Sequence, residues 1–128
     1  MAITKGSNPA AASPMDKWEV QLRKGCLELA ILGSLWGGRL YGLEVLRRMQ
    51  GNSDLALSAS TAYPLLARLK AEGLLESEWV EAEASHPRKY YQLTPAGRLR
   101  AIEMARVWSQ FSASLRDLLS PLLKEDVR

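Results

Sequence analysis

The chain has 128 residues, of which 47% are hydrophobic and 24% are charged. This length and composition suffice for one domain with a single hydrophobic core. The formal net charge of +3 is too small to identify a nucleic-acid partner, so the position of the charges matters more than their sum. One cysteine and one histidine cannot form an intrachain disulfide or a Cys/His metal cluster, and we expect no metal and no other cofactor.

The single thiol, Cys26, indicates a reducing, intracellular environment, and we expect a soluble, cytoplasmic protein. Residues 26–36 are apolar, but Glu28 interrupts them and they fall short of the roughly 20 residues that span a bilayer. Residues 1–15 are rich in small residues and lack the hydrophobic centre of a signal peptide. We expect them to form a mobile tail.

A helix is predicted from Asp16 to about Trp36, and it is apolar on more than one face. One stripe at three- and four-residue spacing consists of Trp18, Leu22, Cys26, Leu29 and Gly33. A second stripe consists of Leu27, Ala30, Ile31 and Leu35. Because a helix with two apolar faces must be covered on both, we expect one stripe to face the core and the other a partner.

Two further helices are expected after the glycines at 37–38. Helical spacing resumes over 41–49 and stops at the turn-forming residues 51–54. The next helix is predicted from about Ser58 to Glu72, with the Ser58 hydroxyl accepting hydrogen bonds from amides of the first turn.

This third helix contains a proline and is followed by a glycine. Pro64 lacks an amide hydrogen and is expected to kink or loosen the early turns. Gly73 can adopt the left-handed conformation that ends a helix. No acidic residue lies between Leu55 and Ala71, so the helix is suited to meet an anion.

Alternating side chains over 75–80 and 89–93 predict two strands that form a hairpin. Residues 94–95, Thr-Pro, supply an N-cap and a first-turn proline for a last helix, which is expected to end at about Leu119, before Pro121. Its apolar stripe consists of Ala101, Met104, Ala105, Trp108, Phe111, Leu115, Leu118 and Leu122.

The order of these elements predicts a mainly α fold, a winged helix-turn-helix of three helices and a two-stranded wing over residues 16–94. A long dimerisation helix follows over residues 95–128. In such a domain the last helix of the helix-turn-helix enters a major groove of double-stranded DNA and the wing lies along the backbone. The expected DNA contacts are Ser58, Ser60, Thr61, Tyr63, Arg68 and Lys70 in the third helix, and His86, Arg88 and Lys89 in the hairpin.

Structural roles are the alternative for several of these residues. Ser58 would then be only a cap, and we assign Leu65, Leu66 and Leu69 to the core in either case. The hairpin also carries Glu76, Glu78, Glu81 and Glu83, so a solvated hairpin of mixed charge is an alternative to DNA contact. Because the acids precede the turn and the bases follow it, we favour backbone contact by Arg88 and Lys89.

The first and last helices have more apolar surface than one small domain can cover, which predicts a homodimer. The expected dimer interface consists of Leu22, Cys26, Met104, Trp108, Phe111, Leu115 and Leu118. Aromatic side chains near a two-fold axis can sandwich a small planar apolar molecule. The expected effector-binding residues are Trp18, Trp108 and Phe111.

No pattern in the sequence indicates an enzyme. Cys26 and His86 have no recognisable third partner for nucleophilic catalysis. The paired glutamates lie in a charged hairpin and not in an enclosed site where burial could raise a carboxyl pKa. We expect no catalytic residues.

Three motifs occur in order: Tyr-Gly-Leu-Glu at 41–44, Thr-Ala-Tyr-Pro-Leu-Leu-Ala-Arg-Leu at 61–69 with Glu-Gly-Leu-Leu at 72–75, and Pro-Arg-Lys-Tyr-Tyr-Gln-Leu-Thr-Pro-Ala-Gly at 87–97. In these motifs the chain resembles the PadR-like transcriptional regulators. The resemblance covers about residues 22–97. It implies a homodimeric winged-helix repressor whose third helix reads an inverted repeat.

By position, the resemblance places Ser60, Thr61, Tyr63 and Arg68 toward DNA and Arg88 with Lys89 on the backbone. The single short terminal helix is similar to the compact branch of the family. Some members of that branch bind drug-like planar compounds between aromatic residues at the dimer interface, and Trp108 stands where such an aromatic is expected. Family wings often carry glycines before the Pro-Arg-Lys run, whereas residues 84–86 here are Ala-Ser-His, and the N-terminal tail is not part of the shared pattern.

We therefore expect a repressor of a palindromic operator that a small planar apolar or drug-like effector releases. Two alternatives remain open from the sequence. One is a winged-helix adaptor that binds another protein without touching DNA, and the other is a small-molecule carrier without gene control.

Overall fold

The computed structural model describes residues 13–55, 57–81 and 86–124. The part of the predicted tail that precedes Ser13 lies outside these residues. So do Glu83, Ala84 and Ser85 of the predicted wing. The elements in chain order are α2 (Pro14–Ser34), β1 (Leu40–Tyr41), α3 (Gly42–Gln50), a short 3-10 helix η1 (Ser53–Leu55), α4 (Ala59–Ala71), β2 (Leu75–Val80), β3 (Arg88–Leu93) and α5 (Pro95–Lys124). The fold class is mainly α with a small sheet, as predicted.

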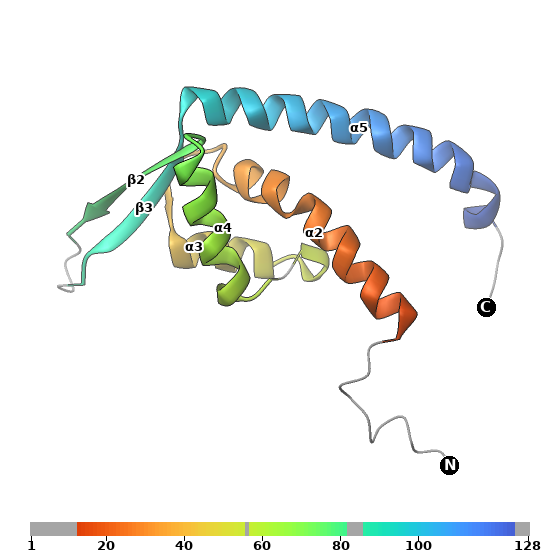
Figure 1. Cartoon of the computed structure of the whole chain (residues 1–128), viewed down its shortest axis with the longest axis horizontal. Helices are drawn as coiled ribbons and strands as arrows, with labels where there is room; N and C mark the ends of the chain where they lie inside the picture. The colour runs from red at the N-terminus through yellow and green to blue at the C-terminus, as the bar shows by residue number, and fades with distance from the viewer. Residues whose placement is uncertain (1–12, 56, 82–85, 125–128) are drawn as a thin grey trace, which may run out of the picture.

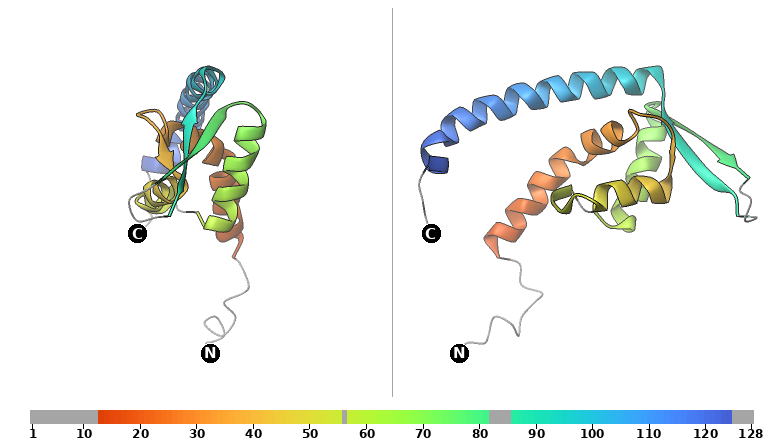
Figure 2. Two further views of the ribbon diagram at one scale, coloured as in Figure 1. Left: turned by 90° about the vertical axis from the view of Figure 1, so that its left-hand side faces the viewer. Right: turned by 180° about the vertical axis from the view of Figure 1, so that it is seen from behind.

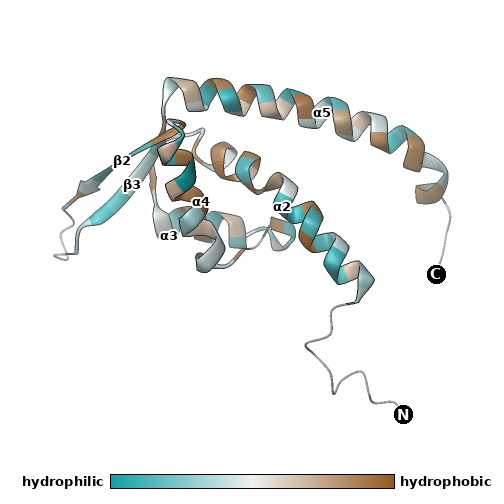
Figure 3. Ribbon diagram, in the orientation of Figure 1, coloured by the Kyte–Doolittle hydropathy of each residue, from teal (hydrophilic) through white to brown (hydrophobic). Residues whose placement is uncertain are grey.

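Helix α2 begins earlier than predicted because Ser13 and Asp16 form a capping box, in which each side chain accepts from the other residue's amide. It ends at Ser34 and not at Trp36. The two apolar stripes separate as expected. Leu27, Ile31 and Leu35 of one stripe are buried in the core, whereas Trp18 and Leu22 of the other are 55% and 54% exposed. Figure 3 shows apolar residues on α2 and on the long helix α5 beside it.

Helix α4 follows the predicted range closely, but its start differs. Ser58 is the N-cap residue, yet its hydroxyl makes no capping hydrogen bond and instead bonds the hydroxyls of Ser60 and Thr61, so the predicted cap was wrong. The helix continues through Pro64 to Ala71. Gly73 has a φ of 80°, the left-handed conformation predicted for it.

The sheet has three antiparallel strands in the order β1-β3-β2, one more than the predicted hairpin. The additional strand, β1, pairs Leu40 with Tyr91 and Tyr41 with Tyr90. The hairpin register runs from Leu75 opposite Leu93 to Val80 opposite Arg88, so β3 begins at Arg88. This places Arg88 within the strand and not in the turn, where the sequence pattern had placed it.

Helix α5 begins as predicted and ends later. The Thr94 hydroxyl accepts from the Gly97 amide at 2.9 Å and donates to the Gly73 carbonyl at 2.7 Å, which joins the start of α5 to the end of α4. The helix runs to Lys124 with Pro121 inside it, so the predicted end at Leu119 was wrong. In Figures 1 and 2 the far part of α5 extends beyond the other helices.

The core lies where α2, α3, α4 and the sheet meet. Its side chains include Ile31 and Leu32 of α2, Val45 of α3 and Leu66 and Leu69 of α4. This confirms the core assignment of Leu66 and Leu69, and Leu65 packs against the same cluster. No helix in the described ranges is long and apolar enough to span a membrane.

Candidate nucleic-acid interface

Helix α4 leaves one face open to solvent. Ala62, Leu66 and Leu69 point into the core, so the opposite side of the helix presents Ser60, Pro64 and Ala67, all of which are exposed. In Figures 1 and 2 the N-terminal end of α4, the far end of the β2–β3 hairpin and the N-terminal half of α2 extend toward the same side of the molecule. Tyr63 on one edge of this face lines a groove with Trp79 of the hairpin, and Arg68 on the other edge contacts Glu28 of α2, so the exposed face of α4 lies between the hairpin and α2.

The predicted hydroxyl residues gather at the start of α4. The Ser58 oxygen lies 2.9 Å from the Ser60 oxygen and 3.2 Å from the Thr61 oxygen, and all three residues are exposed. Hydroxyls both donate and accept hydrogen bonds, so they can meet phosphate oxygens or base edges. The helix dipole at this end favours a negative partner.

Arg68 lies on the side of α4 that faces α2, where acids hold it. Its Nη1 donates to Glu72 at 2.8 Å and its Nη2 donates to Glu28 at 3.2 Å. The hydrogen bond to Glu72, and next that to Glu28, raise the pKa of the Arg68 guanidinium above its already high ordinary value. Lys70 is exposed, and it forms no ion pair with any residue that the structure describes.

The hairpin cations lie against aromatic rings. The Arg88 guanidinium carbon is 4.4 Å from the centre of the Tyr41 ring. The Lys89 nitrogen lies 5.9 Å from the centre of the Trp79 ring and 5.7 Å from that of Tyr91. Such contacts hold a cation in place while its outer donors remain accessible.

An open groove of about 350 Å³ is lined by residues of both α4 and the hairpin. Tyr63, the predicted α4 residue, is 41% exposed and lies so close to Gly42 that a Cβ there would be 2.7 Å from the Tyr63 ring. Burial, and next the charge of Tyr63, raise the pKa of Tyr91. The groove is lined by Tyr41, Gly42, Leu43, Tyr63, Trp79, Arg88, Lys89 and Tyr91. His86 is exposed and lies outside this lining.

Sequence analysis missed Trp79 as a candidate contact. Its side chain is 68% exposed on β2 beside Lys89. A large apolar ring on the solvent side of a strand is unusual. The position of Trp79 in the alternating pattern of the strand was the sequence feature that could have identified it as a candidate contact. An exposed indole ring beside a cation offers a flat apolar surface next to a positive charge.

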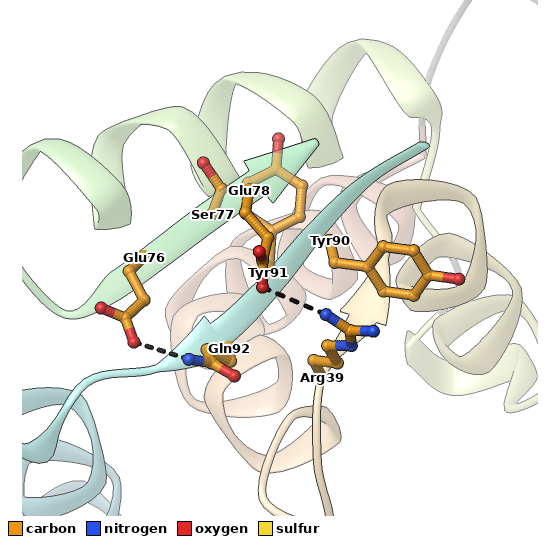
Figure 4. Close-up of a pocket in the computed structure, with 7 residues that line it drawn as sticks. All are labelled: Arg39, Glu76, Ser77, Glu78, Tyr90, Tyr91 and Gln92. Atoms are coloured by element: carbon orange, nitrogen blue, oxygen red, sulfur yellow. Dashed lines mark hydrogen bonds and ion pairs between the residues drawn. The ribbon is translucent and has the colours of Figure 1, made fainter. Parts of the chain in front are cut away.

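A second hollow of the sheet has different chemistry (Figure 4). Its volume is about 250 Å³, and it is lined by Arg39, Glu76, Ser77, Glu78, Tyr90, Tyr91 and Gln92. Arg39 is 3.1 Å from Glu78, and the Gln92 amide donates to Glu76 at 2.6 Å. Two carboxylates and one neutralised guanidinium do not match a phosphate, so we do not assign this hollow to DNA.

The predicted interface and effector residues divide into two groups. Cys26, Met104 and Trp108 meet in a groove of about 380 Å³ between α2 and α5, completed by Gly25, Leu29, Arg100, Glu103 and Val107. Trp18 and Phe111 do not line this groove and are 55% and 64% exposed. Leu115 and Leu118 continue the exposed apolar stripe of α5 at 41% and 77%.

Comparisons with known proteins agree with this architecture. The model of the transcriptional regulator PadR-like family matches residues 31–103. No curated protein matches the chain closely enough to count as a relative.

Several solved structures share the fold. A PadR-like transcription factor from Bacteroides fragilis is 34% identical with a TM-score of 0.66, covering 80% of this chain and 99% of the other. A PadR family regulator from Eggerthella lenta is 30% identical with a TM-score of 0.69, covering 88% and 94%. A PadR-like regulator from Bacillus cereus is 28% identical with a TM-score of 0.70, covering 83% and 99%.

The family match spans more than half of the chain and includes α3, α4 and the hairpin, which carry the candidate DNA contacts. The members of this family are DNA-binding regulators and not enzymes. The chain belongs to the PadR-like family of transcriptional regulators.

Proposed function

We propose that the protein is a homodimeric repressor that occupies a palindromic operator. Each α4 enters a major groove, and the two copies meet successive grooves about 34 Å apart. The observation that carries this proposal is the exposed face of α4, which presents hydroxyls and Lys70 with no acidic residue from 57 to 71. An acid-free helix face beside a cationic groove is what the negative surface of DNA requires.

The α4 residues divide into two kinds of DNA contact. Ser60, Thr61 and Tyr63 reach base edges or nearby phosphates, and Ser58 and Lys70 contact the backbone. Arg68 exchanges a glutamate for a phosphate only when DNA arrives, since two acids hold it in the free protein. We therefore expect Lys70 to contribute more to affinity than Arg68.

The wing contacts are Arg88 and Lys89, with His86 nearer the turn. Long cationic side chains on a hairpin beside α4 can reach the phosphates on one side of the groove. Their aromatic neighbours Tyr41 and Trp79 restrict them, so less side-chain entropy is lost on binding.

Dimerisation accounts for the exposed apolar stripes. Phe111 and Leu118 of α5 are 64% and 77% exposed. Trp18 and Leu22 of α2 are 55% and 54% exposed. Large apolar side chains exposed to this extent are stabilised when a second surface covers them. A second copy supplies an identical stripe, and the interface of Leu22, Cys26, Met104, Trp108, Phe111, Leu115 and Leu118 is then isologous.

A planar apolar effector fits the same interface. Trp108 lines the groove between α2 and α5, and a two-fold axis would bring a second Trp108 toward it, with Trp18 and Phe111 at the margin. Occupation there changes the angle between subunits and hence the spacing of the two α4 helices. Reciprocity requires operator DNA to weaken effector binding by the same factor.

Selection of bound duplexes from a random pool tests the proposal. Two matching half-sites one helical turn apart are expected, and a template carrying the selected site in its promoter should be transcribed less when the protein is added. Enrichment of a single half-site without symmetry would contradict the dimer. Unchanged transcription would contradict repression.

A further inference from the structure

A small groove lies between α2 and the start of α4, on the side away from the hairpin. Its volume is about 160 Å³. Arg23 and Lys24 line it from α2, and Ser58 and Thr61 line it from α4. The rest of the lining is apolar, formed by Val20, Leu27 and Leu57. No lining residue is acidic, so the groove is cationic at its rim.

Arg23 is held in place by the backbone, and neither Arg23 nor Lys24 has an acidic partner among the described residues. The Nε of Arg23 donates to the backbone carbonyl of Asp54 at 2.9 Å, which fixes the guanidinium and leaves its two terminal amino groups for another acceptor. Lys24 is exposed. Neither side chain forms an ion pair within the described ranges.

The α4 side of the groove offers hydrogen-bond donors. The Ser58 hydroxyl does not cap the helix, and the Thr61 amide donates to the Ser58 carbonyl at 3.1 Å, so of the first-turn amides those of Ala59 and Ser60 keep their donors for an external acceptor. The hydroxyls of Ser58 and Thr61 lie within 3.2 Å of each other and can turn toward the groove. Guanidinium, ammonium and hydroxyl donors around one small opening match the oxygens of a phosphate group.

We propose that Arg23, Lys24, Ser58 and Thr61 bind a phosphate of the DNA backbone beside the segment that α4 reads. This inference rests on the proposed function and adds a second backbone contact to it. The hairpin lies on one side of α4 and α2 on the other (Figures 1 and 2). With α4 in the major groove, the wing contacts the phosphate backbone of one DNA strand that borders the groove. Arg23 and Lys24 contact the phosphate backbone of the other DNA strand.

The test measures the salt dependence of DNA binding for Lys24→Gln and Arg23→Gln, each on the selected operator and on a scrambled duplex. Loss of one phosphate contact in both subunits should lower the slope of log K against log salt by about two. Affinity for both duplexes should fall by a similar factor, because a phosphate contact carries no sequence information. The matched control is Arg106→Gln on α5, which removes the same charge from an exposed position outside the lining of the groove.

A neutral methylphosphonate placed in turn at the flanking phosphates identifies the partner. At one of these positions the methylphosphonate should weaken DNA binding by the parent protein and leave DNA binding by the Lys24→Gln variant unchanged. Arg23→Lys should restore part of the slope that Arg23→Gln loses. Thermal unfolding shows whether loss of the Asp54 contact harms the fold, and Lys24, which has no such contact, keeps the test independent of that effect.

If both variants keep the parent's slope while the parent remains selective for its operator, the phosphate site is wrong and the proposed function stands. If the parent itself does not select any duplex, both proposals fail.

Discussion

The guanidinium of Arg68 on α4 lies 3.2 Å from the carboxylate of Glu28 on α2. The second oxygen of the same carboxylate lies 3.6 Å from Arg100 on α5, which also lines the groove beside Trp108. One half-buried glutamate thus joins the helix proposed to read DNA to the helix proposed to form the dimer. A molecule that displaces Arg100 from Glu28 would change the charge available to Arg68.

Replacing Glu28 by Gln should strengthen DNA binding. The change removes one of the two acids that hold Arg68 and leaves Glu72 in place, so Arg68 turns to a phosphate more readily. We expect roughly two- to fivefold tighter binding to operator and scrambled duplexes alike, the magnitude of one exposed ion pair. Titration by fluorescence anisotropy measures it. On an Arg68→Gln background the gain should largely vanish, and an equal gain there would show that Glu28 acts by general charge and not through Arg68.

Leu118→Glu should dissociate the proposed dimer. Leu118 is 77% exposed, so the substitution leaves the monomer fold intact but places a charge in the apolar interface. Sedimentation equilibrium should give half the parent's mass. Leu99→Glu is the control, because Leu99 is 58% exposed on a different face of α5 and should leave the mass unchanged. A parent protein that is monomeric at micromolar concentration would refute the dimer directly.

Gly97→Ala should destabilise the junction between α5 and the sheet. A Cβ at Gly97 would overlap the backbone carbonyl of Leu74, which cannot move without disturbing β2. We expect a loss of about 1–3 kcal/mol in the free energy of unfolding, measured with urea. Gly37→Ala meets no atom within 4 Å and should be nearly neutral. Similar losses for the two variants would mean that glycine flexibility, and not the close approach, sets the effect.

Stability should decline in alkaline solution in a way that depends on Tyr91. Burial raises the pKa of Tyr91, so above about pH 10 the unfolded phenol ionises while the native one remains neutral. This favours unfolding as pH rises toward the native pKa, and the contribution is fully present below pH 10. Tyr91→Phe should show a smaller decline in the urea midpoint between pH 9 and 11, and equal declines would exclude Tyr91 as the cause.

The sequence pattern predicted those elements that are determined by residues close together in the chain. The helix order followed from three- and four-residue spacing, Gly73 from the need for a positive φ, and Thr94 from the cap that precedes a first-turn proline. The division of α2 into a buried and an exposed stripe also followed, because each stripe faces one direction on a helix.

Features that depend on distant partners could not be predicted. Strand β1 has two residues, too few to show alternation, and it exists because β3 offers a free edge far along the chain. The acids around Arg68 include Glu28, which is 40 positions away. Pro121 did not end α5, because one missing amide donor in the last turns of a long helix removes little of its hydrogen bonding.

The groove of Arg23 and Lys24 was missed for the same reason. Both lie on the first helix, among alternating charges that the sequence alone does not distinguish from a solvated face. Only the packing of α2 against the start of α4 brings them beside Ser58.

The measurement that tests the central claim most directly is a gel-shift titration of the purified protein with DNA from upstream of its own gene. A scrambled duplex is the control, and both are titrated at 50 and 200 mM salt. The account predicts a complex of two chains per duplex that prefers the upstream DNA and weakens steeply as salt increases. Equal, weak binding to both duplexes at both salt concentrations would contradict it and favour a winged-helix adaptor whose partner is another protein.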